Sequence, residues 1–348
     1  MEENHSYSSV IGSSSMPYLN SLAQKYGLAT QYYANTHPSI GNYLMMTTGQ
    51  IITNSDGYTG TVTADNIVRH LLTAGITWKS YAESLPSVGY TGGDKYPYIL
   101  HHNPLAYFSD VRNSSVQKLN LVPFPQFATD LANNQLPQFS FVVPNLLNDA
   151  HDGTLAQADG WLKTNIAPLI ASPTFQKDGL LVIVFDESSS TDTAHGGGRV
   201  AFVVVSPTMT APTRSSTLYQ HQNVLRMVMT ALGLTSFPGA AASASSMSDL
   251  FSAPSPTCVL SQTSPSVTIC SPTSGSSLSS PAHVVAATTS SSTVTATQIY
   301  LDGVKVYQVN SPKLDTYLTM STGTHRLTVQ GYNTAGAVFK STEYVTVP

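Results

Sequence analysis

The sequence predicts a two-part protein: an α/β domain with a mostly parallel sheet sandwiched by helices, followed by a small all-β sandwich. Up to about residue 235, apolar strand-like runs alternate with helical segments, which indicates a parallel sheet covered on both faces. A stretch rich in small residues and proline follows at 236–257 and indicates a linker. Beyond it, alternating apolar runs are separated by turn sequences. We therefore predict domains at 1–250 and 264–348, joined by a linker at 251–263.

The strands of the first domain are expected where short apolar, mostly branched runs occur. Five runs fit: 30–34, 76–81, 139–144, 180–185 and 200–207. A helix is expected at 63–75, capped by Thr63 and ended by Gly75. Helical spacing also occurs at 155–170 and 220–233.

The second domain carries two hairpin patterns and no helical spacing. Asp302-Gly303 separates two alternating runs, and Thr334-Ala335-Gly336 separates the next pair. This pattern favours a sandwich of immunoglobulin-like type. Cys258 and Cys270 lie near its start and are either a disulfide or two free thiols.

Composition restricts the class of function. Charged residues make up 10% of the 348 residues, and the formal net charge is -4. A weakly acidic chain without a basic run argues against nucleic-acid binding. No apolar run reaches the roughly 20 residues of a membrane span, so stable membrane insertion is not expected.

Polar clusters follow the predicted strands of the first domain. The strand at 180–185 ends in Asp186 and Glu187, although adjacent carboxylates do not help a buried strand to pack. Ligands bind at the carboxyl ends of parallel strands, so these clusters are expected at one edge of the sheet. The other candidates are Ser39 and Asn42 after 30–34, Asp149, His151 and Asp152 after 139–144, and the loop residues His101, His102 and His195.

These residue types are coherent with phosphoryl transfer. Carboxylates and an Asn oxygen are hard ligands for a divalent cation. The N-terminus of a helix favours the binding of an anion, so a Ser there would lie beside a bound phosphate. A neighbouring metal lowers the pKa of the Ser hydroxyl and makes it a nucleophile. Each feature alone is more often structural, since a Ser before a helix usually caps it and an Asp-Glu pair after a strand usually faces water. Together they favour a covalent phosphoserine route.

Several motifs resemble a known family. They are "EENHSYSSVIG", "HPSIGNYLMMTTG", "NDAHDGTLAQADGWL", "VIVFDESSSTDTAHGGGRVAFVVVSP" and "YQHQNVLRMVMTALGL", and together they cover nearly all of 1–250. The chain resembles the bacterial phosphoesterase family of phospholipases C and certain acid phosphatases, within the alkaline-phosphatase superfamily. One departure is that the glycines follow His195 rather than the Asp-Glu pair.

The resemblance implies a role for each matching residue. A divalent metal would be held by Glu3, Asn4, Ser39, Asp186 and Glu187, and Ser39 would be the nucleophile. His102, His151 and His195 would contact the phosphate or the leaving group, and Asn42 and Asp152 would bind substrate. His221, in an apolar helix, is expected to be structural. In the family, Glu3 and Asn4 would follow a central strand, whereas here Met1 and Glu2 precede them, so we expect the true start to lie upstream.

The predicted activity is that of a metal-dependent phosphoric-ester hydrolase of acid-phosphatase type. A phospholipase C is the alternative, so the substrate is a small phosphate ester or a phospholipid. Scattered tyrosines without a Trp/Leu/Phe-rich loop favour the phosphatase. A second alternative is a catalytically degenerate cell-surface binding protein. The resemblance implies a secreted, periplasmic or cell-surface location, with the second domain contacting a surface or carbohydrate.

Overall fold

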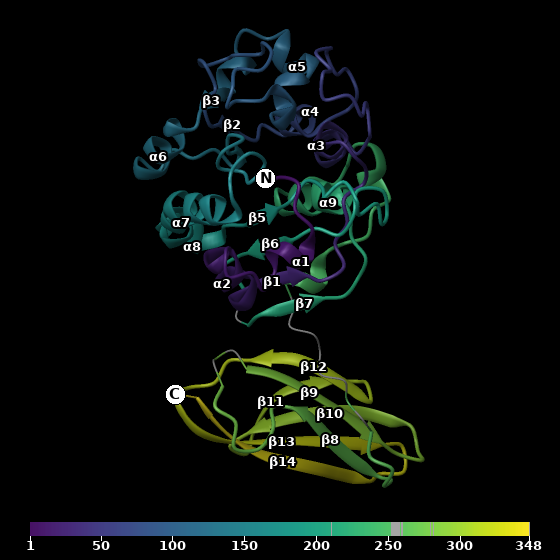
Figure 1. Cartoon of the computed structure of the whole chain (residues 1–348). Helices are drawn as coiled ribbons and strands as arrows, with labels where there is room; N and C mark the ends of the chain where they lie inside the picture. The colour runs from purple at the N-terminus through teal and green to yellow at the C-terminus, as the bar shows by residue number, and fades with distance from the viewer. Residues whose placement is uncertain (210, 252–257, 259, 279, 281, 348) are drawn as a thin grey trace. The chain divides into compact units, whose positions relative to one another are not determined.

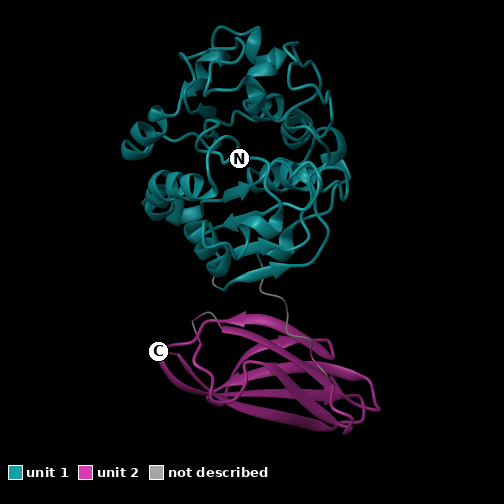
Figure 2. Cartoon of the chain, viewed as in Figure 1, with its two compact units in different colours: residues 1–253 teal, residues 254–348 magenta. Residues whose placement is uncertain are grey.

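The protein is described from a computed structural model that covers all residues except 210, 252–257, 259, 279, 281 and 348. It contains two compact units, residues 1–253 and 254–348 (Figure 2). Most of the predicted linker lies outside the described residues. No helix in the described part of the chain is long and apolar enough to cross a membrane.

Unit 1 contains two small sheets. The first has the order β3-β2-β4 and is entirely parallel. The second has the order β5-β6-β1-β7, in which β6 runs antiparallel to both neighbours while β1 and β7 are parallel. The strands are β1 (Gly27–Ala29), β2 (Trp78–Ala82), β3 (Leu121–Pro123), β4 (Phe139–Val143), β5 (Leu181–Val184), β6 (Phe202–Val205) and β7 (Thr213–Ser215).

Helices flank these sheets, as predicted for an α/β domain (Figure 1). Core side chains of β5 and β6 pack with Leu162 and Ile166 of α7 and with Val224 and Met227 of α9. The α-helices are α1 (Tyr7–Val10), α2 (Pro17–Lys25), α3 (Ser39–Thr48), α4 (Ile67–Thr73), α5 (Ser109–Arg112), α6 (Pro125–Ala132), α7 (Leu155–Ala171), α8 (Pro173–Asp178) and α9 (His221–Ala231). Short 3₁₀ turns are η1 (Leu100–His102), η2 (Pro104–Tyr107), η3 (Gln117–Asn120), η4 (Gly239–Ala242) and η5 (Ser248–Leu250).

Two predicted elements differ from the structure. The strand expected at 30–34 ends early, because β1 stops at Ala29 and Tyr32 and Tyr33 then form single bridges to two different partners. The helix expected from Thr63 starts at Ile67, because the side chain of Asn66 accepts the Arg69 amide and caps it. Gly75, with φ of 68°, follows its end as predicted.

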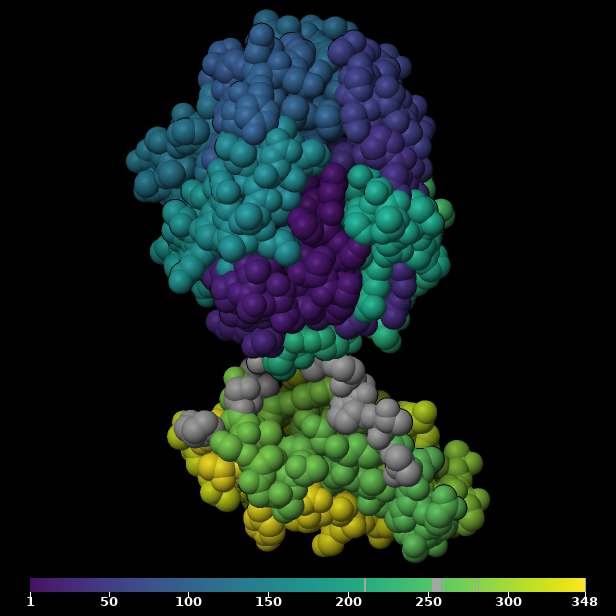
Figure 3. All heavy atoms as spheres, viewed as in Figure 1, coloured from purple at the N-terminus to yellow at the C-terminus, as the bar shows by residue number. Residues whose placement is uncertain are grey.

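Residues 1 and 2 lie between the two sheets of unit 1. The Met1 amino group donates to the Val142 carbonyl of β4, and the Glu2 amide donates to the Val184 carbonyl of β5. Glu2 pairs with Phe185 in parallel. In the space-filling view the N-terminal segment, in purple, reaches the surface between teal and green parts of the chain (Figure 3). The first residues therefore join β4 to β5 and bring Glu3 to the ends of both strands.

Unit 2 is an antiparallel sandwich of two sheets. Their orders are β11-β10-β13-β14 and β12-β9-β8, and their facing sides enclose Val284, Ile299, Leu327 and Val345. The strands are β8 (Ser266–Ser271), β9 (Ala282–Thr289), β10 (Val294–Leu301), β11 (Val304–Val309), β12 (Lys313–Leu318), β13 (Gly323–Asn333) and β14 (Val338–Val347).

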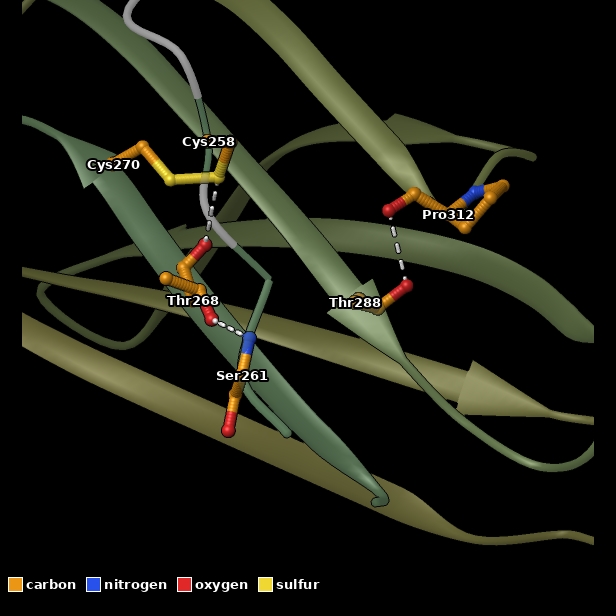
Figure 4. The surroundings of a disulfide bond; sticks show 6 residues. All are labelled: Cys258, Ser261, Thr268, Cys270, Thr288 and Pro312. Carbon is orange, nitrogen blue, oxygen red and sulfur yellow. Dashed lines mark hydrogen bonds between the residues drawn. A yellow bond between two sulfur atoms is a disulfide. The ribbon is translucent and has the colours of Figure 1, made fainter. Parts of the chain in front are cut away.

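Both predicted hairpins of unit 2 are present. Asp302 and Gly303 have φ of 51° and 91° and join β10 to β11, as a two-residue turn with positive φ requires. Gly336, with φ of 78°, lies in the turn between β13 and β14. Cys258 and Cys270 are joined as a disulfide that fastens the segment entering the unit to β8 (Figure 4).

Candidate functional site

The candidate site forms where residues 1–4 meet the end of β5. The Asp186 amide donates to the Glu2 carbonyl at 3.0 Å, and the Asn4 amide donates to Asp186 Oδ1 at 3.3 Å. Asn4 has φ of 51°, which turns the chain sharply after Glu3. Glu3 and Asp186 are both fully buried. The segment of Asn4 and that of Asp186, 182 residues apart in the chain, thus place the carboxylates of Glu3 and Asp186 side by side.

Ser39 is the first residue of α3 and points its hydroxyl into this cluster. Its Oγ lies 3.1 Å from Glu3 Oε2 and 3.4 Å from Asn4 Oδ1. The helix begins after Pro38, whose side chain offers no cap. Instead, the next amide, that of Ile40, donates to the carboxylate of Asp56 at 3.1 Å. The carboxylate of Asp56 therefore occupies this helix N-terminus, where the helix dipole favours a negative charge.

The amide of Asn4 and the carboxylate of Asp186 have the arrangement of cation ligands. One amide atom of Asn4 lies 3.0 Å from Glu3 Oε2 and 3.2 Å from Asp186 Oδ1. As nitrogen it would donate to both carboxylates, and as oxygen it would share a cation with them. Asp186 Oδ2 is buried without a hydrogen-bond partner among the described residues. Four hard oxygen donors converge here, one each from Glu3, Asn4, Ser39 and Asp186. These residues therefore fit a divalent metal.

Glu187 lies beside the cluster rather than at its centre. Its Oε2 is 3.0 Å from His37 Nδ1 and accepts from Asn42 Nδ2 at 3.4 Å. The other polar atom of Asn42 accepts the amides of Asn35 and Thr36, at 2.9 and 3.1 Å. Asn42 therefore fixes the segment before Ser39, and any substrate contact would be additional.

Burial raises the pKa of every carboxyl group in the cluster, and repulsion between carboxylates raises those of Glu3 and Glu187 further. Desolvation is the main cause for Glu3, whose pKa is raised well above its usual range, and Asp186 and Asp149 add repulsion. Burial raises the pKa of Asp186 to about 6. Burial and the charge of Asp186 raise the pKa of Glu187 to about 9. Concentrated negative charge of this kind is what a bound cation would neutralise.

A second buried group adjoins the first through Glu3. His102 lies between Glu3 and Asp149, with Nε2 3.5 Å from Glu3 Oε1 and Nδ1 3.3 Å from Asp149 Oδ2. Its ring stacks on Tyr43, whose hydroxyl donates to Glu3 Oε1. Ligand atoms of Glu3, His102 and Asp149 all lie within 4.8 Å of one another, so these residues also could hold a metal. Burial lowers the pKa of His102 to about 3, which keeps it neutral.

The remaining predicted residues lie further out. His151 Nδ1 is 2.7 Å from Asp152 Oδ1, both side chains are exposed, and the His151 ring is 6.1 Å from that of His102. His195 is exposed, and the centroid of its ring lies 4.3 Å from that of Tyr33. The structure thus brings Glu3, Asn4, Ser39 and Asp186 together and places Glu187 and His102 beside them. Among the described residues, His195 makes no hydrogen bond, ion pair or ring contact with this group.

Comparison with known proteins identifies the family to which unit 1 is similar. A model described as "Phosphoesterase family" matches residues 12–235, which is more than half of the chain. The chain belongs to the phosphoesterase family. A bacterial Ig domain model matches residues 265–329 of unit 2. The predicted family and the predicted second domain are both confirmed.

Curated relatives of this phosphoesterase are named as phosphatases. A probable acid phosphatase of Kluyveromyces lactis is 33% identical over 65% of this chain and 55% of its own length. A phosphatidylinositol-3-phosphatase of Mycobacterium tuberculosis is 36% identical over 55% of this chain and 62% of its own length. The chain spans about half the length of most of these relatives. A Bacteroides thetaiotaomicron structure from glycosaminoglycan metabolism shares the fold, with 11% identity, a TM-score of 0.51 and coverage of 72% and 80% of the two chains.

Sequence reasoning did not assign roles to several residues of the phosphoesterase site. Tyr43 follows Ser39 by four positions, so helical periodicity alone could have placed it on the same face. Asp56 lies in a loop without any motif. His101 is largely buried, its Nδ1 has no partner among the described residues, and burial lowers its pKa to about 4. His221, by contrast, was expected to be structural, and it is buried and bonds the Asp186 carbonyl at 2.6 Å and the Tyr32 hydroxyl at 2.8 Å.

Proposed function

We propose that this protein is a metal-dependent phosphomonoesterase of acid-phosphatase type that acts through a phosphoserine at Ser39. The observation that supports it most directly is the position of Ser39 Oγ, at a helix N-terminus and in contact with Glu3 and Asn4. The names of the curated relatives support the substrate class, since each describes a phosphatase.

The metal would be held by Glu3, Asn4, Ser39 and Asp186, with Glu187 completing the set. Glu187 follows Asp186 directly in the chain, and the charge of Asp186 contributes to its raised pKa. A bound divalent cation would neutralise these carboxylates and favour the alkoxide form of Ser39.

The chain's own residues would carry out transfer in two halves. Ser39 Oγ loses its proton and attacks phosphorus, the bond from phosphorus to the ester oxygen breaks, and the departing alkoxide takes a proton. Water then attacks the phosphoserine, the bond from phosphorus to Oγ breaks, and Ser39 recovers its proton as phosphate leaves. The Ile40 amide faces the same side of the helix N-terminus and would contact a phosphate oxygen in place of Asp56.

His151 is the proposed proton donor to the leaving group. It is solvent-exposed beside His102, and its Nδ1 lies 2.7 Å from Asp152 Oδ1, which leaves Nε2 free for the substrate. His102 is neutral and buried, so we assign it to orienting Glu3 and Asp149. Contacts of His195 and Asn42 with substrate stay predictions.

We also propose a location for the protein and a role for unit 2. A disulfide in unit 2 and the Ig domain fit a secreted or cell-surface phosphoesterase. Unit 2 would then contact a surface or a carbohydrate, while unit 1 acts on a small phosphate ester or the phosphate of a lipid headgroup.

The test compares hydrolysis of p-nitrophenyl phosphate and p-nitrophenyl phosphorylcholine by the purified full chain, with and without a chelator. We expect turnover of the monoester, loss of activity with chelator, and recovery when a divalent metal is restored. Preferential hydrolysis of the phosphorylcholine ester would instead indicate a phospholipase C. No hydrolysis of either ester by a folded, metal-loaded protein would favour the degenerate binding protein.

A further inference from the structure

The four-stranded sheet β11-β10-β13-β14 of unit 2 has one face in the core of the unit and an outer face that lies away from it. Unit 2 contains four lysine and arginine residues, and three of them, Lys305, Arg326 and Lys340, are exposed on the outer face. Glu343 is the one acidic residue of these four fully described strands, and it pairs with the core residue Leu327 on the inner face. The outer face is therefore positively charged.

Two tyrosines of the outer face lean toward each other along adjacent strands. The Tyr300 hydroxyl donates to Gln298 Oε1 at 2.7 Å, two residues earlier in β10. The Tyr332 hydroxyl donates to Gln330 Oε1 at 2.9 Å, two residues earlier in β13. The two glutamines are direct partners in antiparallel strands, so the hydroxyls meet above them, with 3.3 Å between the two oxygens. A ring that reaches the side chain two positions back lies along the sheet, and both half-buried rings therefore turn one face outward.

The hydroxyls of this tyrosine pair can accept a hydrogen bond from outside the protein. A phenol has one proton to donate, and each of the two donates it to a glutamine, so neither has a proton for the other. Two oxygens 3.3 Å apart are thus able to accept from one external donor. The neighbouring amides are also ordered, since Gln298 Nε2 donates to Gln308 Oε1 at 2.8 Å. This row of amide and phenol groups suits a ligand that is rich in hydroxyls.

Basic side chains lie on both sides of the tyrosine pair. Lys305 of β11 is the strand partner of Tyr300, and Lys340 of β14 is the partner of Gln330. Arg326 lies two residues before the partner of Tyr300 on β13. None of these three basic residues forms an ion pair with a carboxylate of the described chain. Their charge is therefore available to a negatively charged ligand.

We propose that this outer face binds an acidic polysaccharide. Sugar rings stack on the outward faces of Tyr300 and Tyr332, sugar hydroxyls donate to the two phenol oxygens, and carboxylates of the polymer pair with the flanking basic residues. The tyrosine pair spans four residues of β10, from Ala296 opposite Tyr332 to Tyr300, or about 13 Å at about 3.3 Å per residue, which suits a polymer. The site deepens the contact with carbohydrate proposed above for unit 2. It rests on that part of the proposed function and is independent of the reaction of unit 1.

An anionic membrane is a less suitable ligand for this face. It would satisfy the positive charge, but attachment to a membrane surface also depends on large apolar side chains that enter the headgroup layer. The outward positions of the four strands carry no Trp, Phe or Leu, and amide and phenol groups occupy their centre. The polar centre favours a polysaccharide.

The test measures binding of the purified full chain to polygalacturonate by affinity electrophoresis. A chelator is present, so that no metal links the protein to the polymer. The fully methyl-esterified polymer is the matched ligand, because it keeps the sugar backbone and lacks the charge. We expect binding to polygalacturonate to be at least about tenfold tighter than binding to the ester, and to weaken as salt rises from about 50 to about 500 mM. Equal binding of the two polymers, or binding of neither, would overturn the proposal.

Two double variants locate the binding face. Lys305→Gln with Lys340→Gln removes charge, and Tyr300→Ala with Tyr332→Ala removes the rings, and each should weaken binding at least about tenfold. The matched control is Lys313→Gln with Tyr317→Ala, because both residues are exposed on β12 of the other sheet.

The control double variant should bind as the unchanged chain does. The melting of unit 2 checks the folding of each variant, and the exposed lysine pair keeps the test decisive if loss of the half-buried rings unfolds the unit. Unchanged binding by a folded lysine variant, or an equal loss in the control, would refute the assignment.

Vesicles of phosphatidylglycerol and phosphatidylcholine form a further arm of the experiment. Binding of these vesicles without binding of polygalacturonate would assign the face to an anionic membrane and overturn the proposal. Hydrolysis of p-nitrophenyl phosphate is measured on the same samples. Absence of hydrolysis with retained polymer binding counts against the reaction of unit 1 alone, so the two proposals fail separately.

Discussion

Glu3 is the residue on which most contacts of the candidate site depend. Its two carboxylate oxygens meet Ser39, Tyr43 and His102, which come from α3 and η1. It is fully buried, and desolvation raises its pKa well above the usual range. A carboxylate in this position either takes up a proton or binds a cation. The chemistry of the site therefore depends on which of the two it does.

The Ser39→Ala substitution tests the role of the nucleophile. It removes the hydroxyl but leaves Glu3, Asn4 and Asp186 in place, so we expect near-normal melting. Activity on p-nitrophenyl phosphate should fall at least about a thousandfold, because covalent attack supplies much of the barrier reduction. A low residual rate of hydrolysis by water is compatible with this result.

The matched variant is Asp186→Asn, which removes a ligand but keeps the nucleophile. We expect activity to be lost through weaker metal binding and partly rescued by excess metal. Ordinary activity in Ser39→Ala with loss in Asp186→Asn would exclude the phosphoserine route.

At the scale of elements, the glycine-rich loop explains how the approach to Ser39 is fixed. The loop between β5 and β6 packs against the backbone of 34–36, which leads into α3. A Cβ added at Gly197 would lie 2.3 Å from the Thr36 carbonyl oxygen. The glycines after His195 therefore permit close contact between two backbones. This is the structural reason for their position in this sequence.

Gly197→Ala tests this contact. The overlap with backbone cannot be relieved by a side-chain rotation, so we expect destabilisation of about 1–3 kcal/mol in urea unfolding, together with reduced activity. Gly160→Ala in α7 is the control, because nothing lies within 4 Å of the added Cβ, and it should stabilise by about 0.5–1 kcal/mol. Equal stability of the two variants would refute the steric argument.

The disulfide is the second element-scale feature open to test. Replacing both cysteines, as Cys258→Ala with Cys270→Ala, opens a loop with a sequence separation of 12 and should cost unit 2 about 3 kcal/mol by the chain-entropy estimate. Calorimetry of the full chain should show the transition of unit 2 move down. The hydrolysis that we propose for unit 1 should not change, and a fall in its rate would show that the two units are coupled.

At the scale of the whole molecule, the candidate site and the disulfide lie in different units. The buried carboxylates lie in unit 1, and raised pKa values there make the metal-free fold sensitive to pH. Unit 2 has its own core and a disulfide, and no member of the candidate site lies in it. The two units are therefore expected to respond separately to pH, metal and truncation.

The metal-free protein should lose stability as the pH rises. A carboxyl group whose folded pKa lies above its ordinary value contributes full stability below that ordinary value. The contribution is lost as the pH rises through the folded pKa, about 6 for Asp186 and about 9 for Glu187. Thermal melting with chelator should therefore give a lower Tm for unit 1 at pH 9 than at pH 7, a range in which the buried histidines His101, His102 and His221 stay neutral. Added divalent metal should raise Tm more at pH 9, where protons compete less. A larger metal effect at pH 7 would contradict this account.

Removal of unit 2 tests where the chemistry resides. A chain ending near residue 253 should keep nearly all turnover of a small soluble ester, because every candidate ligand and nucleophile lies in unit 1. Folding is checked by the melting of unit 1, which should be unchanged. A large loss of kcat in the folded, shortened chain would show that unit 2 contributes to the site.

Sequence patterns alone determined the fold class, the hairpins of unit 2 and the family. They are local properties: branched apolar runs, an Asp302-Gly303 turn and short motifs keep their meaning wherever the chain folds. The predicted start of one helix was wrong for a local reason, because the side chain of Asn66, and not that of Thr63, caps α4. The free-energy difference between two neighbouring N-cap residues is too small to be judged from the sequence.

Only the tertiary structure decided which polar residues meet. Glu3, Ser39 and Asp186 are far apart in sequence and converge because residues 1 and 2 lie between β4 and β5. The tertiary structure also gives Tyr43 its contact with Glu3, and His102 its contact with Asp149. His195 packs against Tyr33, and its position depends on a loop whose conformation the sequence motifs do not specify. Contacts of this kind arise from how strands and helices pack against one another, and a linear pattern specifies the elements but not that packing.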